Sequence, residues 1–417
     1  MIGDRRRVVV VGGGASAAAA LGELRRLRFA GQVTVIAGEP TAPYNRTTVN
    51  KGLLSGEVDL DSVLLPADAP EATQWLLGRR AEGLDLAERT VAVHRHGRVP
   101  FDGVILATGG TPRVLPAHWE PHVHRITTAS DALNLRAALS GGKKDVTIVG
   151  GGLIGSEAAS ILTAAGHHVA LVDANKEPLR RHLGDTVARW ANERHAAVGV
   201  RLLLGKRVSD VGTARGRRRQ LGLDDGTLQT ADVVVAALGH GSAVPWLAES
   251  GLLVADGIVT DAELRAITPG RPSDPDAAIA AVTVAGDLAR VPHPVFAGTL
   301  LRSGHWGNAL SQGAHAARTV LRDLGSASSS DGPVHFDELP SYSTYIHGTK
   351  VHIVGLPHLG THAKMLRHQT PDGRFAVAHL DAGGTVVGAV AVAGAKPLTA
   401  IRPVIAARGS LADIAIA

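Results

Sequence analysis

Two glycine-rich segments carry the residue types and the spacing that hold phosphate groups. They read Val8-Val9-Val10-Val11-Gly12-Gly13-Gly14-Ala15-Ser16-Ala17 and Val146-Thr147-Ile148-Val149-Gly150-Gly151-Gly152-Leu153-Ile154-Gly155. The first glycine allows a tight turn, the second lets the backbone approach a pyrophosphate, and the third packs a helix against a strand. The phosphates then lie at the helix N-terminus, where free N–H groups and the dipole favour an anion. The pair predicts two bound dinucleotides, one on Gly12, Gly14 and Ala17 and the other on Gly150, Gly152 and Gly155.

A carboxylate follows each glycine turn at the distance expected of a ribose ligand. Glu39 comes after the strand-like Val33–Ile36, and Asp173 comes after Val169–Val172. A carboxylate at this place accepts hydrogen bonds from ribose hydroxyls and repels a 2′-phosphate. Asp173 therefore favours NADH over NADPH. The basic residues nearby leave that preference open; they are Lys176, Arg180 and Arg181.

Both turns are placed by the same kind of elements, an apolar strand before the glycines and an alanine-rich helix after them. Further strands end in glycine or acid; they are Gly103–Leu106, Asp232–Leu238 and Thr283–Ala285. Residues 325–333 have the composition of a linker. The region after it alternates short strand patterns and ends in a helix from Pro397, which is typical of an interface or dimerisation domain.

The composition excludes several classes of protein. The 417 residues carry a net charge of +5 and are 45% hydrophobic, yet no apolar stretch is long enough to span a membrane. We expect a soluble, cytoplasmic protein. The basic run Arg215–Arg219 lacks interleaved aromatic residues, so it predicts a solvated hairpin end and no nucleic-acid partner. The histidines show no metal-ligand spacing, and we predict no metal site.

The chain has no cysteine. A disulfide, an iron–sulfur cluster and a catalytic thiol are therefore all excluded from this polypeptide. Any redox chemistry must be carried by organic cofactors.

These landmarks resemble the FAD-dependent ferredoxin reductases that serve cytochrome P450 and aromatic-ring dioxygenase systems. The resemblance covers nearly the whole chain. The matching segments are Pro43-Tyr44-Asn45-Arg46-Thr47-Thr48-Val49-Asn50-Lys51, Ala107-Thr108-Gly109, Ala285-Gly286-Asp287, the helix with Arg302, Trp306, Asn308 and Gln312-Gly313, and Val351–Pro357. It implies an α/β, glutathione-reductase-like fold with two Rossmann-type dinucleotide-binding domains and a C-terminal α+β domain.

The resemblance also implies domain boundaries. An FAD-binding domain would comprise residues 1–112 and 241–325, an NAD-binding domain residues 113–240, and the C-terminal interface domain residues 334–417. The cofactors would be noncovalent FAD and NADH.

Roles for individual residues follow from the same resemblance. Arg46 would neutralise the flavin pyrophosphate, and Asp287 would accept hydrogen bonds from the ribityl chain. Ala107, Thr108 and Gly109 would lie at the strand end beside FAD, and Trp306 on the helix that covers the flavin ring. Lys51 would stabilise negative charge that develops near the ring. Glu157, paired with Lys51, would help to orient the nicotinamide.

Three departures from the family pattern fall around the flavin. Thr47-Thr48 replace a proline pair, Ser343 stands where a tryptophan shields the flavin, and Gly304 replaces a glutamate. All three would open the substrate side and leave both nucleotide sites unchanged.

Three functions stay open at this point. The first is an NADH-dependent reductase that passes electrons through FAD to a ferredoxin-type iron–sulfur protein, acting as a monomer or homodimer. The second is a flavoenzyme of the same fold that acts on a small molecule, such as a quinone, dioxygen or a biosynthetic intermediate. The third, with little specific support, is a redox-sensing flavoprotein.

Overall fold

The computed structural model describes residues 6–66, 68–214, 218–241, 244–270, 274–326 and 334–413. Most of the predicted linker, Arg215–Arg217 of the basic run and residues 271–273 lie outside this range. The chain divides into two compact units. Unit 1 comprises Met1–Arg46, Val63–Thr111 and Gly241–Glu338, and unit 2 comprises Thr47–Ser62, Pro112–His240 and Leu339–Ala417. The short strands β8 (Thr111–Pro112) and β17 (His240–Gly241) mark two of the chain positions where one unit gives way to the other.

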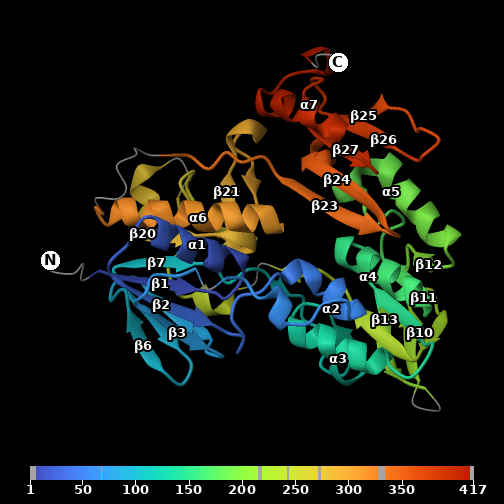
Figure 1. The fold of residues 1–417 in the computed structure, drawn as a ribbon, viewed down its shortest axis with the longest axis horizontal. Helices are drawn as coiled ribbons and strands as arrows, with labels where there is room; N and C mark the ends of the chain where they lie inside the picture. Colours follow the sequence, from blue (N-terminus) through green and yellow to red (C-terminus); the bar gives the residue numbers. More distant parts are fainter. Residues whose placement is uncertain are drawn as a thin grey trace. The chain divides into compact units, whose positions relative to one another are not determined.

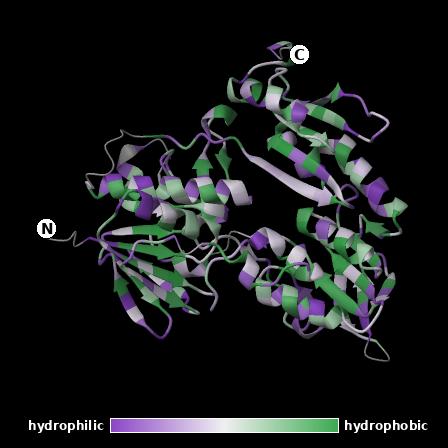
Figure 2. Ribbon diagram, in the orientation of Figure 1, coloured by the Kyte–Doolittle hydropathy of each residue, from purple (hydrophilic) through white to green (hydrophobic). Residues whose placement is uncertain are grey.

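Unit 1 is built on a six-stranded sheet in the order β19-β20-β7-β1-β2-β3. All neighbouring strands run parallel except β19, which is antiparallel to β20. The strands are β1 (Arg7–Val11), β2 (Gln32–Ala37), β3 (Thr73–Leu77), β7 (Gly103–Leu106), β19 (Arg265–Ile267) and β20 (Ala278–Val284). Val8–Val11 are almost completely buried, as expected of a central parallel strand covered on both faces. Figure 2 shows this strand and its neighbours as mostly hydrophobic.

Helices α1 (Ala15–Arg26) and α6 (Trp306–Asp323) cover the same face of this sheet (Figure 1). They pack closely because residue 313 is glycine; a Cβ there would overlap the backbone of Ser16. Two smaller sheets complete the unit. Their strands are β4 (Ala81–Asp85), β5 (Thr90–Val93), β6 (Gly97–Pro100), β18 (Ile258–Val259), β21 (Ala289–Pro292) and β22 (Leu300–Leu301).

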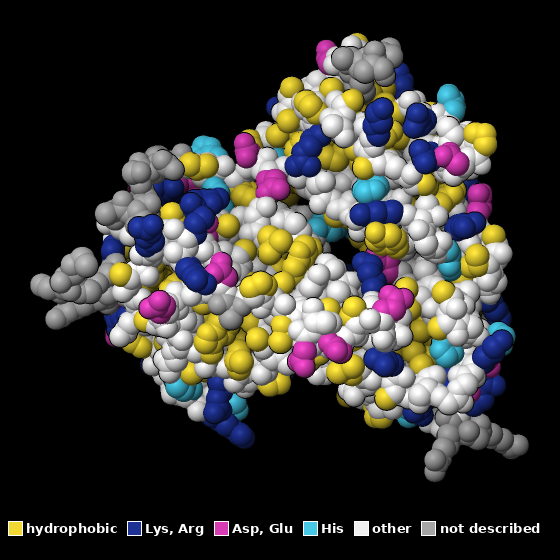
Figure 3. Space-filling model, viewed as in Figure 1, with side chains coloured by type: hydrophobic (Ala, Val, Ile, Leu, Met, Phe, Trp, Pro, Cys, Tyr) yellow, Lys and Arg dark blue, Asp and Glu magenta, His cyan; other side chains and the backbone are white. Residues whose placement is uncertain are grey.

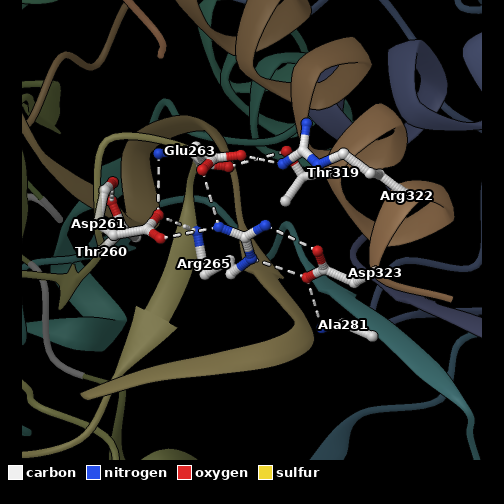
Figure 4. Close-up of polar contacts among 8 residues, drawn as sticks. All are labelled: Thr260, Asp261, Glu263, Arg265, Ala281, Thr319, Arg322 and Asp323. Atoms are coloured by element: carbon white, nitrogen blue, oxygen red, sulfur yellow. Dashed lines mark hydrogen bonds and ion pairs between the residues drawn. The ribbon is translucent and has the colours of Figure 1, made fainter. Parts of the chain in front are cut away.

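A buried ion network ties the C-terminal end of α6 to the sheet (Figure 4). Arg265 on β19 makes a bidentate pair with Asp323, at 2.8 Å from Nε to Oδ2 and 2.7 Å from Nη2 to Oδ1. Its guanidinium also lies 3.0 Å from Glu263 Oε1. The hydroxyl of Thr319 donates to the carbonyl of Glu263 at 2.9 Å. Breaking a buried network of this kind leaves uncompensated charge, so it holds α6 in a defined place.

Unit 2 contains a second parallel sheet, in the order β12-β11-β10-β16-β9. Its strands are β9 (His124–Arg125), β10 (Asp145–Val149), β11 (His168–Asp173), β12 (Arg201–Leu204) and β16 (Val233–Ala236). The unit's other elements in this part are α2 (Gly52–Ser55), α3 (Ala129–Leu139), α4 (Leu153–Ala164), α5 (Arg180–Ala197) and the antiparallel β13 (Val208–Thr213), β14 (Arg219–Leu223) and β15 (Leu228–Ala231). Strands β13 and β14, which flank the undescribed residues of the basic run, pair with each other as the predicted hairpin requires.

The C-terminal region of unit 2 is an antiparallel sheet in the order β23-β24-β27-β26-β25. Its elements are β23 (Ser341–Ile346), β24 (Thr349–Gly355), β25 (His362–Arg367), β26 (Phe375–Leu380), β27 (Val386–Val392) and α7 (Lys396–Ala406). One apolar core joins this sheet to α5: Leu183 and Val187 of the helix pack with Ile346, Val351 and Phe375 of the sheet. The core of this sheet is therefore continuous with α5. In the described ranges, no helix is both long and apolar enough to cross a membrane.

Candidate functional site

The first glycine turn leaves no room for side chains where it meets the end of β7. Gly12 has a φ of 139°, and a Cβ there would overlap the carbonyl oxygen of Ala107. Ala107 in turn donates its N–H to Val11 at 2.7 Å. Thr108, the next residue, is exposed, and Gly109 has a φ of 74°. The turn and the strand end that the sequence singled out therefore lie directly against each other.

The N-terminus of α1 is open to a ligand. Gly14 occupies the N-cap position, the helix has no side-chain cap, and its first turn holds no acidic residue. By contrast, α3 begins with a capping box in which Thr128 and Asp131 satisfy each other's backbone N–H groups. The uncapped N–H groups of α1 are available to a phosphate.

Glu39 and Arg46 lie together beside this turn. The carboxylate of Glu39 accepts a 2.8 Å hydrogen bond from the hydroxyl of Tyr44 and forms an ion pair with Arg46. The Nε atom of Arg46 is 3.9 Å from the place where a Cβ of Gly14 would lie. One carboxylate and one guanidinium therefore stand at the helix N-terminus, the first suited to ribose hydroxyls and the second to a pyrophosphate.

Asp287 lies at the end of β20, in a short 3-10 turn that begins at Gly286. The N–H of Gly286 donates to the buried side chain of Gln312 at 2.8 Å, which ties the turn to α6. Burial raises the pKa of Asp287, whereas the charges of Arg302 and Arg46 act in the opposite direction. A Cβ at Gly304 would be 3.2 Å from Asp287 Oδ2, so the glycine leaves one edge of this carboxylate uncovered. Trp306 is half-buried at the first position of α6.

The second glycine turn repeats the first in unit 2. Gly150 has a φ of 105°, and a Cβ there would overlap the carbonyl oxygen of Ala237, just beyond β16. Gly152 is the N-cap of α4, which again has no side-chain cap, and no atom lies within 4 Å of its Cβ position. At Gly155 a Cβ would overlap the carbonyl oxygen of Gly150. This turn therefore requires glycine at Gly150 and Gly155 for steric reasons, whereas the Cβ position of Gly152 faces open space.

Asp173 lies at the end of β11 with its carboxylate pointing to the turn. Its Oδ2 atom accepts the N–H of Gly151 at 2.7 Å. Its Oδ1 atom accepts the backbone and side-chain amides of Asn175, at 2.7 and 2.9 Å. Of the basic residues nearby, Arg180 pairs with Asp185 at 2.6 Å. These donors hold the carboxylate against the second glycine turn.

Lys51 and Glu157 form the ion pair that the sequence predicts, with 3.1 Å between Lys51 Nζ and Glu157 Oε2. The carboxylate is buried at 6% exposure in the second turn of α4, whereas the lysine side chain is 30% exposed. Asn50 Nδ2 donates to the same oxygen at 2.7 Å. The other oxygen, Oε1, accepts the hydroxyl of Thr344 at 2.7 Å and the N–H of Tyr345 at 3.1 Å.

The aromatic residues near Ser343 lie on opposite faces of β23. Ser343 and Tyr345 are exposed, and the Tyr345 ring lies 6.0 Å from Lys51 Nζ and 5.6 Å from Lys350 Nζ. Tyr342 points the other way, where its hydroxyl lies 3.1 Å from His182 Nδ1 and burial raises its pKa well above the usual range. Tyr342 is therefore no substitute for the missing tryptophan, and Tyr345 shares the face of Ser343.

Sequence reasoning missed the groups that hold the two unit 2 carboxylates. Asn175 follows Asp173 closely and has the side chain of a turn residue, a signal that was available. Thr344 falls on the inward face of a strand pattern, but its acceptor Glu157 is 187 residues away. No local pattern predicts such a contact.

Each glycine turn, Gly12–Gly14 or Gly150–Gly152, forms a cradle with the helix N-terminus and the carboxylate beside it. The two cradles fit the phosphates and riboses of dinucleotides. Each offers uncapped helix N–H groups, a glycine at the close approach and a carboxylate at the adjacent strand end. The residues that would hold FAD are Gly12, Gly14, Ala17, Glu39, Arg46 and Asp287, and those that would hold NADH are Gly150, Gly152, Gly155 and Asp173. Together these features define a flavoprotein of the class with two dinucleotide folds.

Comparison with known proteins gives the family. The model of the family described as pyridine nucleotide-disulphide oxidoreductase matches residues 6–313. The chain belongs to this family, although without cysteine it has no disulfide chemistry of its own.

Its relatives include a probable ferredoxin reductase, CtmF, of Castellaniella defragrans, 28% identical over 87% of this chain and 84% of the relative. The ferredoxin–NAD(+) reductase component of the p-cumate 2,3-dioxygenase system of Pseudomonas putida is 28% identical over 93% of this chain and 90% of its own. The crystal structure of Fdr9 matches with a TM-score of 0.83 and 28% identity, covering 99% of this chain and 100% of Fdr9.

These matches confirm the predicted fold class and the resemblance to the FAD-dependent ferredoxin reductases. They also confirm FAD and NAD(H) as the cofactors. The residue roles and the domain boundaries stay predictions.

Proposed function

We propose that this chain is an NADH-dependent FAD oxidoreductase that passes electrons from NADH to a ferredoxin-type iron–sulfur protein of a P450 or ring-hydroxylating oxygenase system. The relatives' descriptions support the reaction. The observation that carries the proposal is the presence, in one chain, of two uncapped glycine cradles with different polar surroundings and a Lys51–Glu157 pair whose carboxylate is buried. Bound FAD supplies the chemistry that accepts a hydride and releases its two electrons singly.

In unit 1, the chain's own residues bind and orient FAD. Arg46 places a guanidinium where the pyrophosphate meets α1, and Glu39 offers a carboxylate to the adenosine ribose. Asp287, fixed by the Gly286–Gln312 hydrogen bond, accepts from the ribityl hydroxyls. Those hydroxyls supply the donors that offset the cost of burying this carboxylate.

In unit 2, Asp173 accepts from the ribose of NADH, and Glu157 and Lys51 act at the nicotinamide end. Glu157 fixes the ammonium group of Lys51 by the 3.1 Å ion pair. Held there, Lys51 offers a positive charge that favours the arrival of negative charge from the nicotinamide. No acid–base step is required of either residue.

A small-molecule acceptor is the second candidate, and one observation favours it. Ser343 is exposed on β23 where the family carries a shielding tryptophan, and Gly304 is exposed beside Asp287. On the face seen in Figure 3, lysine and arginine side chains are scattered and form no single continuous patch. With Ser343 and Gly304 leaving the flavin side open, a quinone or dioxygen would react with the reduced enzyme directly.

Anaerobic stopped-flow absorbance of the purified FAD-containing protein tests the proposal. NADH should bleach the flavin band rapidly, and a ferredoxin added in the second mix should restore it faster than a quinone does. Ser343→Trp should slow the quinone reaction and leave the ferredoxin reaction less affected. If the flavin is not reduced by NADH, the proposal fails. If only the quinone restores the band, the small-molecule function replaces it.

Asp287→Ala gives a separate check on the FAD site. A buried acceptor for the ribityl chain is lost, at a cost of about 1–3 kcal/mol. The flavin-to-protein ratio after gel filtration should fall, and acid precipitation should release the flavin of the parent protein completely. Full flavin occupancy in the variant would contradict the assignment of Asp287.

A further inference from the structure

The carboxylate of Glu157 has all its acceptor positions taken by groups of this chain. A carboxylate offers about four lone-pair sites, and four donors approach it: Asn50 and Lys51 at Oε2, and Thr344 and the N–H of Tyr345 at Oε1. The donors come from the segment before α2 and from β23, while Glu157 itself lies on α4. The position of the carboxylate is therefore decided by two segments distant in sequence.

Strand β23 is the edge strand of its sheet. Side chains of α4 accept hydrogen bonds from N–H groups in this strand and in the turn after it. The N–H of Tyr345 donates to Glu157, and the N–H of His347 donates to Ser160 Oγ at 3.1 Å. Glu157 and Ser160 lie three residues apart on one face of the helix. The two N–H groups belong to Tyr345 on the strand and to His347 in the turn that follows it, so these contacts hold both β23 and its turn against α4.

Thr344 is the side chain of β23 that donates a hydrogen bond to the Glu157 carboxylate and so orients it. It is 2% exposed and points inward between two exposed residues, Ser343 and Tyr345. Its hydroxyl makes one of the two shortest contacts to Glu157, at 2.7 Å, whereas Lys51 lies at 3.1 Å and is the more accessible donor. With Thr344 on Oε1, the plane of the carboxylate is set and Oε2 is directed to Asn50 and Lys51.

We propose that Thr344 is a positioning residue of the nicotinamide end of the NADH site: it holds Glu157, and through it Lys51, in the orientation that receives the nucleotide. The inference rests on the proposed function of Glu157 and Lys51. It makes the C-terminal sheet a part of the NADH site in unit 2, in addition to any role at the electron acceptor.

The test measures NAD+ binding to the FAD-containing protein by isothermal titration calorimetry, which needs no turnover. Thr344→Val keeps the shape of the side chain and removes the donor, so the Kd for NAD+ should rise about tenfold, as expected for a hydrogen bond to a charged group. Thr344→Ser restores the hydroxyl and should bind within about twofold of the parent. Thr319→Val is the matched control, since Thr319 is equally buried and donates only to a backbone carbonyl in unit 1.

A double-mutant cycle with Glu157→Gln shows whether Thr344 acts through the carboxylate. In the Glu157→Gln protein, Thr344→Val should change the NAD+ Kd by less than about twofold, because the interaction it removes is already altered. Equal effects in both backgrounds, or parental NAD+ binding by Thr344→Val, would overturn the proposal.

Two outcomes separate this inference from the proposed function. If Glu157→Gln and Lys51→Met also bind NAD+ like the parent and reduce FAD normally, the assigned roles of those residues fail. If these variants lose NAD+ while Thr344→Val does not, only the role of Thr344 fails.

Hydrogen exchange gives a second measurement should Thr344→Val not fold. In the parent, saturating NAD+ should slow amide exchange in the peptide that spans β23 by at least about threefold and leave β26 unchanged, since ligand binding suppresses local opening. Unchanged exchange in β23 would contradict the proposal.

Discussion

The two glycine cradles share one turn geometry but differ in where the chain makes its closest backbone approach. In both, the first glycine abuts a carbonyl just beyond a parallel strand, Ala107 in unit 1 and Ala237 in unit 2. In unit 2 the tightest approach lies inside the turn, where Gly155 meets Gly150. In unit 1 the equivalent place holds Ala17, fully buried, and the tight approach has moved to the crossing of α6 over Ser16 at Gly313. The close approach in unit 1 therefore lies between two helices, whereas in unit 2 it lies within the turn.

The cradles also differ in charge. Arg46 stands at the first N-terminus and pairs with Glu39, whereas nothing lies within 4 Å of the Cβ position of Gly152 at the second. A guanidinium at a pyrophosphate adds charge-assisted hydrogen bonds. The difference suits a resident cofactor in unit 1 and one that enters and leaves in every cycle in unit 2.

Lowering the pH should reduce the stability of unit 2 more than that of unit 1. Burial lowers the pKa of His182, His195 and His379 in unit 2, and of His315 in unit 1, to about 4 in each case. A histidine whose folded pKa lies below its unfolded value of about 6.5 binds more protons when unfolded, so stability is lost as the pH falls from about 6.5 to 4. At pH 5 we expect losses of about 1–2 kcal/mol for each imidazole.

Hydrogen exchange in urea, followed on peptides of each unit at pH 7 and pH 5, measures this difference. The exposed His96 provides the control, because His96→Gln should leave the pH response of both units unchanged. Equal acid sensitivity of the two units would contradict the prediction.

Gly155→Ala should damage the second cradle severely. The new methyl group would overlap the Gly150 carbonyl, so the turn must open. We expect NAD+ affinity to fall about a hundredfold, from a distortion of about 3 kcal/mol. The reciprocal change, Ala17→Gly, should leave FAD bound and cost about 1 kcal/mol through helix propensity. NAD+ titration measures the effect of Gly155→Ala, and the flavin content measures that of Ala17→Gly. A Gly155→Ala protein that binds NAD+ normally would show that the turn relaxes without cost.

Arg46→Gln should weaken FAD binding without affecting NAD+ binding. Loss of one charged contact to a phosphate predicts a rise of about tenfold in the FAD Kd. Equilibrium dialysis with fluorescence detection of free flavin measures it, and Arg79→Gln, a cation elsewhere in the same unit, serves as the control. Unchanged FAD affinity would remove the charge difference as an explanation for a resident cofactor.

Asn175→Ala should produce the smallest effect. Asp173 would keep the Gly151 N–H and the backbone N–H of residue 175 but lose the side-chain amide. The preference for NADH over NADPH, expected at about tenfold to hundredfold, should shrink about threefold, whereas Asp173→Asn should abolish most of it. The ratio of flavin reduction rates with the two nucleotides measures this, and a parent that prefers NADPH would assign control to the neighbouring basic residues.

Local patterns in the sequence were sufficient for much of the fold. The Val8–Val11 and Val146–Val149 runs, each followed by glycine, predicted the central strands and their turns, and both lie in parallel sheets. The short strand patterns expected after the linker, and the helix that follows them, were also correct. These features depend on side-chain alternation, burial and glycine conformation, all of which act within about ten residues.

The sequence by itself excluded a thiol and predicted two dinucleotides with a carboxylate for each, and its family resemblance predicted the Lys51–Glu157 pair. Only the tertiary structure decided what holds those groups. Thr344 and Asn50 reach Glu157 from distant segments, Gly313 lets α6 approach the backbone of Ser16, and α5 shares its core with the C-terminal sheet. The physical reason is that hydrogen bonds and close packing depend on where whole elements meet, and that meeting is set by the summed burial of many apolar residues.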